Sequence, residues 1–251
     1  MKKLLFTIVV LLALTNSAWA DAGDNYQNAL KALAAKDYPT ALTEFEAALT
    51  ADPDNLQYGS EYRQAVIQAN DAYDRCIKFF EKLTADNPTA PNAWLNFGLA
   101  YVDKIPAAGT VTQVILANTA LAHFTKSIEL KPTWISLYCR GNSYLFWPKI
   151  FNRTQFGVAD LEGAMKIQKE DKKRIYHIRT YIGLGQAHWK MDDEAKAKII
   201  WKEGLELFPD NVHLKAFLSK EGDDLKEYIE DMLDPNKRVD TNLSEIWTDK
   251  N

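Results

Sequence analysis

The sequence predicts an all-α fold built from repeated helix pairs, for three reasons. Its 251 residues include only 11 Gly and 9 Pro, too few for the many tight turns of a β-sandwich or a propeller. Apolar residues make up 47% of the chain and occur along its whole length, which excludes disordered and collagen-like classes. One pattern of small, aromatic and Pro residues also recurs at fixed spacing, as is typical of repeat proteins.

The first twenty residues predict a secretory signal peptide. Lys2 and Lys3 precede an apolar run over residues 4–14, and Ala18 and Ala20 supply the small side chains that signal peptidase requires. As a helix this run would be only about 16 Å long, against about 30 Å for the hydrocarbon core of a bilayer. We therefore expect cleavage after Ala20 and a periplasmic or secreted chain. Its net charge would change from −4 to −6, because two lysines are lost.

Four segments end in the same pattern, in which a small residue is followed by an aromatic residue four positions later and by Pro eight positions after that. The four sets are Ala41, Phe45 and Pro53; Cys76, Phe80 and Pro88; Ala120, Phe124 and Pro132; and Ala197, Trp201 and Pro209. Residues four apart lie on one face of a helix, and Pro cannot continue that helix. Each segment therefore predicts a second helix that ends at its Pro.

A matching first helix precedes the later endings, with a glycine between large side chains. Trp94, Gly98 and Tyr101 show the pattern, and Tyr181, Gly185 and His188 repeat it. Together the two helices resemble the tetratricopeptide repeat, in which aromatic side chains fit against small residues of the facing helix. The resemblance implies a right-handed superhelical solenoid of about five helix pairs. We expect them at 22–55, 57–90, 91–133, 134–170 and 178–211.

The residues after the last repeat predict capping helices over 212–233, which would cover the final apolar face of the solenoid. Gly222 is expected to end one helix, and Asp224 with Glu227 resembles a capping box that starts the next. The tail over 234–251 is mostly polar, yet Val239, Leu243 and Ile246 are apolar. It either docks on the chain's own surface or inserts into the groove of another molecule, so self-association through the tail stays open.

The sequence contains no recognisable constellation for catalysis, metal binding or a cofactor. The four histidines are isolated, and neither a His-Glu-x-x-His helix nor a Cys-x-x-Cys pair occurs. Nucleophile elbows, phosphate loops and dinucleotide fingerprints are missing as well. The negative net charge argues against a nucleic-acid partner. We therefore predict neither an enzyme, nor a cofactor or metal site, nor a nucleic-acid-binding protein.

The resemblance implies instead a scaffold or adaptor that binds a protein or peptide in the concave groove lined by the first helices. Such a scaffold would suit the assembly of an envelope complex. The candidate partner-binding residues are Tyr58, Leu95, Leu99, Tyr138, Asn142, Phe146, Trp147, Arg179, Gln186 and Trp189. Among them, Arg179 is the cation that could pair with a terminal carboxylate.

Two repeats are longer than the usual length. Extra residues around 105–109 predict a longer second helix in the third repeat, and an aromatic loop over 144–153 lengthens the fourth. Trp147 and Phe151 either tuck under this loop as a seal or make it one lip of the groove. The alternative function is a periplasmic receptor for a small ligand or a lipid that uses the loop as its pocket.

Overall fold

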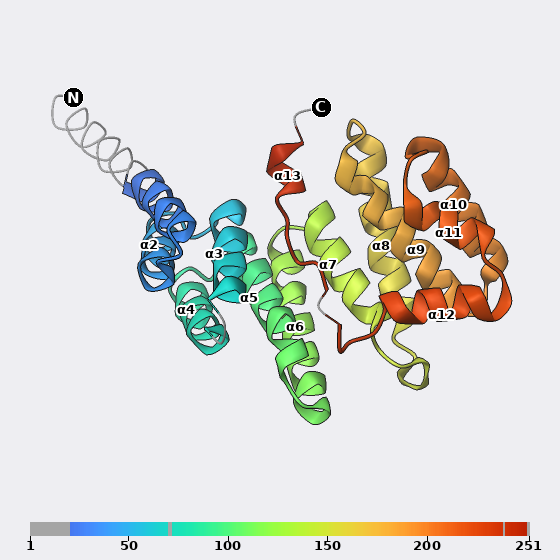
Figure 1. Cartoon of the computed structure of the whole chain (residues 1–251), viewed down its shortest axis with the longest axis horizontal. Coiled ribbons are helices and arrows are strands. Elements are labelled where there is room, and N and C mark those ends of the chain that lie inside the picture. Colours follow the sequence, from blue (N-terminus) through green and yellow to red (C-terminus); the bar gives the residue numbers. More distant parts are fainter. Residues whose placement is uncertain (1–20, 70–71, 238, 250–251) are drawn as a thin grey trace, which may run out of the picture. The chain divides into compact units, whose positions relative to one another are not determined.

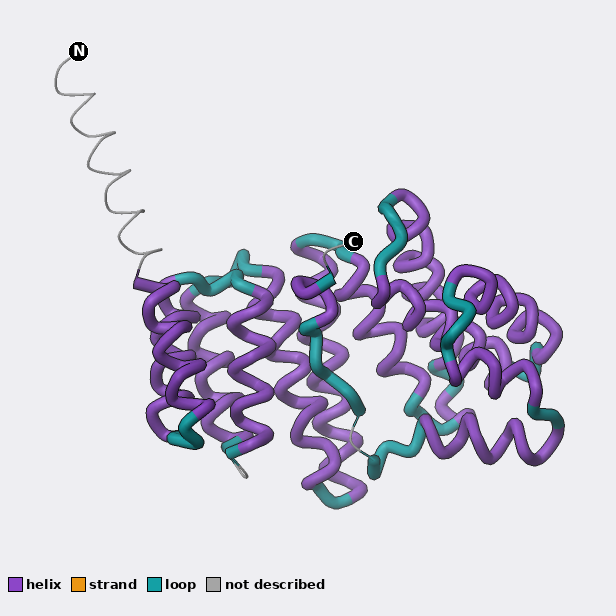
Figure 2. Tube along the Cα trace, turned by 45° about the horizontal axis from the view of Figure 1, so that its top comes forward, coloured by secondary structure: helices purple, strands orange, loops and turns teal. Residues whose placement is uncertain are grey.

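The structure, a computed structural model, describes residues 21–69, 72–237 and 239–249. In this part of the chain helices and loops occur and strands do not (Figure 2). The chain divides into two compact units, of which unit 1 comprises residues up to Lys104 together with Thr241–Ser244. Unit 2 comprises Ile105–Asp240 and the residues from Glu245 onward. The signal peptide predicted over residues 1–20 lies outside the described residues.

Unit 1 is a series of helices joined by short turns. Residues 21–34 form the first of them, and the next four are α2 (Tyr38–Ala51), α3 (Leu56–Gln68), α4 (Tyr73–Asp86) and α5 (Pro91–Lys104) (Figure 1). Asp37 begins α2 by accepting a hydrogen bond from the backbone N–H of Thr40 at 3.3 Å. The rings of Phe45, Tyr62 and Phe80 are fully buried in the core between these helices.

Unit 2 holds the later helices. Its first long helix, α6 (Thr110–Leu130), follows the extra residues around 105–109 that predict a longer second helix in the third repeat. The order is η1 (Ile105–Ala107), α6 (Thr110–Leu130), α7 (Trp134–Leu145), η2 (Lys149–Phe151), α8 (Thr154–Glu170), η3 (Ile175–His177), α9 (Ile178–Lys190), α10 (Glu194–Leu207), α11 (Val212–Ser219), α12 (Gly222–Met232) and α13 (Glu245–Thr248). α6 has 21 residues, against 14 in α5. Its first turns leave Val111, Val114 and Ile115 exposed.

Glycines let the paired helices of unit 2 approach closely. A methyl group added at Gly185 of α9 would lie only 2.0 Å from the indole Nε1 of Trp201 on α10, and Trp201 is fully buried. At Gly141 of α7 it would lie 2.9 Å from Leu161 of α8. The ring of Trp201 thus occupies space that is free only because residue 185 has no side chain.

The helices after the last pair cover an apolar face. Leu214 and Phe217 of α11, with Leu225 and Ile229 of α12, are buried against Trp201 in one cluster. The expected start of the second of these helices at Asp224 is wrong, because α12 begins at Gly222, whose φ is +53°. Asp224 lies instead in the first turn, where a carboxylate is stabilised by the helix dipole.

Candidate functional site

In unit 1, aromatic and aliphatic residues predicted to bind a partner are packed into the helices. Tyr58 of α3 stacks on Tyr26 with ring centroids 4.4 Å apart, and burial raises the pKa of its hydroxyl. Leu95 and Leu99 of α5 are buried, with Leu99 only 4% exposed. Binding by these three residues stays a prediction, and a partner would reach Leu95 or Leu99 only after a change at the surface that covers them.

The polar centre of unit 1 is Arg63 of α3, which is fully buried. Its Nε donates to Asn96 Oδ1 at 3.0 Å, and its Nη1 donates to Asp103 Oδ2 at 2.7 Å. Asn96 packs against Gly59, where an added methyl group would lie 2.3 Å from the amide nitrogen. Close packing therefore fixes the amide, and the amide and the carboxylate together hold the guanidinium in one orientation.

The third acceptor of Arg63 comes from the C-terminal tail. Nη2 donates to the backbone carbonyl of Thr241 at 3.1 Å, and the Thr241 hydroxyl donates to Asp103 Oδ1 at 2.5 Å. Gln64 lies 3.4 Å from the same hydroxyl and donates to it. Thr241 and Leu243 are both buried, whereas Asn242 between them is exposed. This part of the tail is therefore held by its backbone, by one hydroxyl and by one aliphatic side chain.

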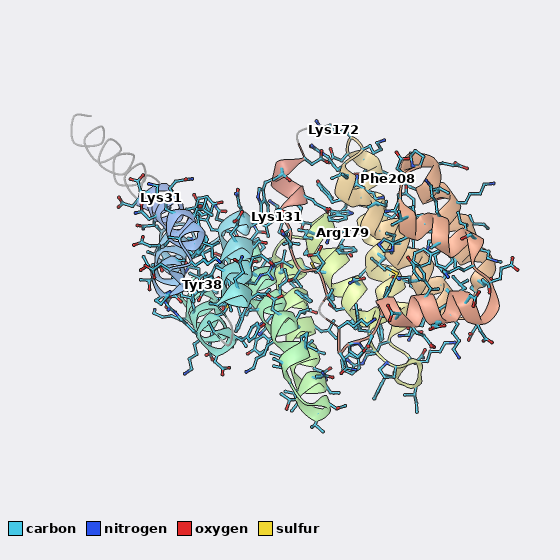
Figure 3. The ribbon with its side chains drawn as sticks, in the orientation of Figure 1. Lys31, Tyr38, Lys131, Lys172, Arg179 and Phe208 are labelled. Carbon is cyan, nitrogen blue, oxygen red and sulfur yellow. The ribbon has the colours of Figure 1, made fainter. Side chains whose placement is uncertain are left out.

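The corresponding polar centre of unit 2 is Arg179 of α9 (Figure 3). Its guanidinium pairs with Glu245 at 3.0 Å and with Asp240 at 3.4 Å, and its side chain is 18% exposed. Further along, the backbone N–H of Ile175 donates to Asp249 at 2.8 Å. Arg179 thus binds carboxylate side chains of the chain's own tail, and its pairing with the terminal carboxylate of a partner stays a prediction.

Tyr138 of α7 lies beside this arginine. Its ring stacks on Trp134 with centroids 5.2 Å apart, and Trp134 is fixed by hydrogen bonds from its indole N–H to Gln168 and Thr180. Burial raises the pKa of Tyr138 to about 12, although the charge of Arg179 acts in the opposite direction. Tyr138 therefore stays neutral at physiological pH and can donate its hydroxyl proton.

The remaining predicted residues occupy different surroundings in unit 2. Gln186 is buried and its amide donates to the sulfur of Met232 at 3.7 Å. Asn142 and Phe146 are half-buried on and just after α7, and Trp189 is half-buried on α9. Of the ten candidates, Tyr138 and Arg179 are brought together; the others are not joined to them by the contacts described above.

The aromatic loop over 144–153 holds Trp147 inside. Trp147 is 6% exposed, the guanidinium of Arg153 lies 3.8 Å from its ring centre, and Phe151 meets it edge to face at 5.6 Å. Phe151 itself is 52% exposed. Trp147 therefore acts as a seal, while the ring of Phe151 remains half accessible.

A cleft of about 770 Å³ lies next to this loop in unit 2. The loop contributes Pro148 and Lys149 to its lining, whereas Trp147 is not among the lining residues. Lys149 pairs with Asp192 at 2.6 Å, and Lys190 donates to the backbone carbonyl of Trp147 at 2.6 Å. Burial and the neighbouring Lys149 lower the pKa of Lys190 to about 8. These charged walls do not favour a lipid pocket.

Arg63 is the functional candidate that the repeat pattern did not single out. It lies on a helix whose neighbouring residues Tyr62, Ala65 and Val66 are buried, and a cation among them is a signal of a buried polar contact. Asn96, Leu99 and Asp103 also share one face of α5, because they are three and four residues apart. The contribution of Thr241, 178 residues from Arg63, has no local sequence signal.

The described residues contain no group of three His, Cys, Asp or Glu side chains placed to hold a metal ion. No helix in the same part of the chain is both long and apolar enough to cross a bilayer.

Comparison with known sequences identifies one repeat directly. Residues 178–211 match the family profile described as tetratricopeptide repeat. These residues contain α9 and α10, with the close approach of Gly185 and Trp201. They form a tetratricopeptide repeat. No curated protein matches the chain in sequence.

Solved structures extend the tetratricopeptide fold to most of the chain. A thermophilic tetratricopeptide protein of Thermus thermophilus is similar with a TM-score of 0.55 and 16% identity, covering 79% of this chain and 97% of its own. A tetratricopeptide protein from Parabacteroides merdae has a TM-score of 0.54 and 13% identity, with 92% and 81% covered. MamA from Desulfovibrio magneticus has a TM-score of 0.51 and 16% identity, with 76% and 97% covered. The predicted fold class, an all-α tetratricopeptide solenoid, is confirmed.

Proposed function

We propose that this chain is an exported tetratricopeptide scaffold that binds an extended peptide or protein segment and serves in the assembly of an envelope complex. The supporting observation is that each unit already holds polypeptide through an arginine. In unit 1, Arg63 binds the backbone carbonyl of Thr241. In unit 2, Arg179 binds the carboxylates of Asp240 and Glu245. Carbonyl and carboxylate groups are what an extended, acidic partner segment would offer to the same arginines.

Photocrosslinking in the cells of origin tests partner binding. A photoreactive residue is placed at Gln64, which lies half-buried beside the tail, rather than at the buried Leu99. The control position is Lys82 on α4, whose side chain is 77% exposed. We expect one protein to be captured from residue 64 and not from residue 82. The same products from both positions, or only lipid or sugar, would contradict a protein scaffold.

The export part of the proposal is supported by the charged, apolar and small residues over 2–20. We expect the chain purified from the envelope or the medium to begin at Asp21. Intact-mass measurement of that material is the test. A chain that keeps residues 1–20 and stays in the cytosol would contradict export while leaving the binding proposal in place.

Self-association through the tail stays a prediction. Exchange of tails between two copies would give a dimer that dissociates on dilution, because the same contacts can form within one chain at an effective concentration on the order of millimolar. Solution mass measured over a dilution series distinguishes the two arrangements.

A further inference from the structure

The polar cluster around Arg63 is incomplete without a segment from outside the helices of unit 1. Asn96 accepts from Nε of the guanidinium, Asp103 accepts from Nη1, and Nη2 donates to the carbonyl of Thr241. Asp103 in turn receives the Thr241 hydroxyl on its second oxygen. Arg63 is fully buried with the tail in place, so removal of the tail segment would leave Arg63 Nη2 and one Asp103 oxygen without these partners until water or another ligand replaces them.

The contacts define what chemistry can complete the cluster. Arg63 donates to a backbone carbonyl, a group that any residue supplies. Asp103 and Gln64 both form hydrogen bonds with the hydroxyl of that same residue. Leu243, two positions later, is buried. Asn242, between these two residues, is exposed. This alternation is that of an extended strand-like segment, in which residues two apart face the same side.

The described residues of the tail before α13 have no regular structure. Residues 239–243 have no helix, and the short α13 follows from Glu245 to Thr248. The segment is therefore held in unit 1 by a few side-chain and backbone contacts rather than by a helix of its own. A peptide with the same groups can make the same contacts.

We propose that the Arg63–Asn96–Asp103 cluster is a recognition site for extended peptides that carry Ser or Thr two residues before an aliphatic residue, and that Thr241–Leu243 occupies it as an exchangeable internal ligand. This inference rests on the proposed scaffold function and specifies its ligand. A partner segment must compete with the tail, whose attachment to the same chain gives it a high effective concentration. The tail therefore sets a threshold concentration below which the site stays closed to partners.

The test uses the full chain and a fluorescent synthetic peptide that copies residues 239–246. In the tail variant Thr241→Val, Leu243→Ala, the internal ligand loses the hydroxyl and the buried side chain. We expect this variant to bind the peptide at least about 10-fold more tightly than the unchanged chain, measured by fluorescence anisotropy. Circular dichroism checks that the helices persist, since both substitutions lie outside them.

Two controls make the result specific. The same peptide carrying Thr241→Val should bind the tail variant at least about 10-fold more weakly than the unchanged peptide does. This is the effect expected for loss of a hydrogen bond to a charged group. Thr112→Val, the same substitution at an exposed position of α6, should leave peptide binding as it is in the unchanged chain.

Two results would overturn the inference. One is equal peptide binding by the unchanged chain and the tail variant, and the other is no binding by either. If the photoreactive residue at position 64 still captures one cellular protein in that case, the scaffold proposal stands and only the ligand assignment fails. If crosslinking fails while the peptide binds the tail variant as described, the site is a closed internal contact and the scaffold proposal fails.

Discussion

Single residues decide how closely the helices of each pair approach. Gly185 faces the rigid, fully buried indole of Trp201, whereas Gly183, two residues earlier on α9, has its nearest neighbour at 3.4 Å from the position of an added methyl group. The same helix therefore contains one glycine that packing requires and one that it tolerates.

Gly185→Ala should destabilise the protein by about 1–3 kcal/mol, because the added methyl group cannot fit beside Trp201 without moving the helices. Gly183→Ala is the matched control. It should have no packing cost and gain up to about 1 kcal/mol of helix propensity. Urea unfolding followed by circular dichroism measures both. Equal destabilisation by the two substitutions would show that close approach at residue 185 is not the cause.

His123 on α6 makes stability depend on pH. Burial lowers the pKa of His123 to about 4, against about 6.5 for an unperturbed histidine. As the pH falls from about 6.5 to about 4, the unfolded chain takes up a proton before the folded chain does, so the free energy of unfolding decreases. His123→Gln should make the decrease between pH 7 and pH 5 smaller in urea titrations. An identical decrease in both proteins would contradict this assignment.

At the scale of elements, the loop over 144–153 carries one buried aromatic side chain, Trp147, and one that is half exposed, Phe151. Trp147 is buried beneath Arg153, and its carbonyl also accepts from Lys190. Phe151 contacts Trp147 with one edge but remains 52% exposed. The loop thus has an inner residue that stabilises the fold and an outer one that is available for contacts.

Trp147→Ala should cost about 3–5 kcal/mol of unfolding free energy, the usual range for removal of a buried aromatic side chain. Phe151→Ala should cost less than about 1 kcal/mol of unfolding free energy, because about half of the Phe151 side chain is already exposed to solvent in the folded chain. Thermal and urea unfolding of both variants provide the comparison. A cost at Phe151 as large as that at Trp147 would place both rings in the folded core.

The elements that could be predicted from the sequence are those fixed by local spacing. Gly185 and Trp201 belong to neighbouring helices of one repeat, and their residue types alone indicate a close fit. Helical periodicity predicts that Leu95 and Leu99 line a groove, but it specifies only a face of the helix and not what covers that face, and both residues are buried. Arg63 and Thr241 meet across 178 residues, and no repeat pattern encodes such a contact.

On the scale of the whole molecule, repeats contact chiefly their neighbours along the chain, so a local defect should stay local. α9 contacts α10 and α8, while Trp201 also packs against Phe217 of α11. Unit 1 has a separate core around Phe45, Tyr62 and Phe80.

Hydrogen exchange with mass spectrometry can show this locality. Gly185→Ala should increase exchange in α9, α10 and α11, with a much smaller change in α2 and α3, because the two groups of helices have different cores. A uniform increase in both units would mean that the chain unfolds as a single cooperative block. The Gly183→Ala protein, measured in parallel, should show no increase in either unit.

Thr241 is synthesised after every helix from α2 to α12, yet it supplies a hydrogen-bond acceptor to Arg63 on α3. A nascent chain that has already formed its early repeats must therefore keep that guanidinium hydrated until the later residues have been made. The hydrogen bonds of the polar cluster in unit 1 can therefore be completed only after residue 241 has been synthesised.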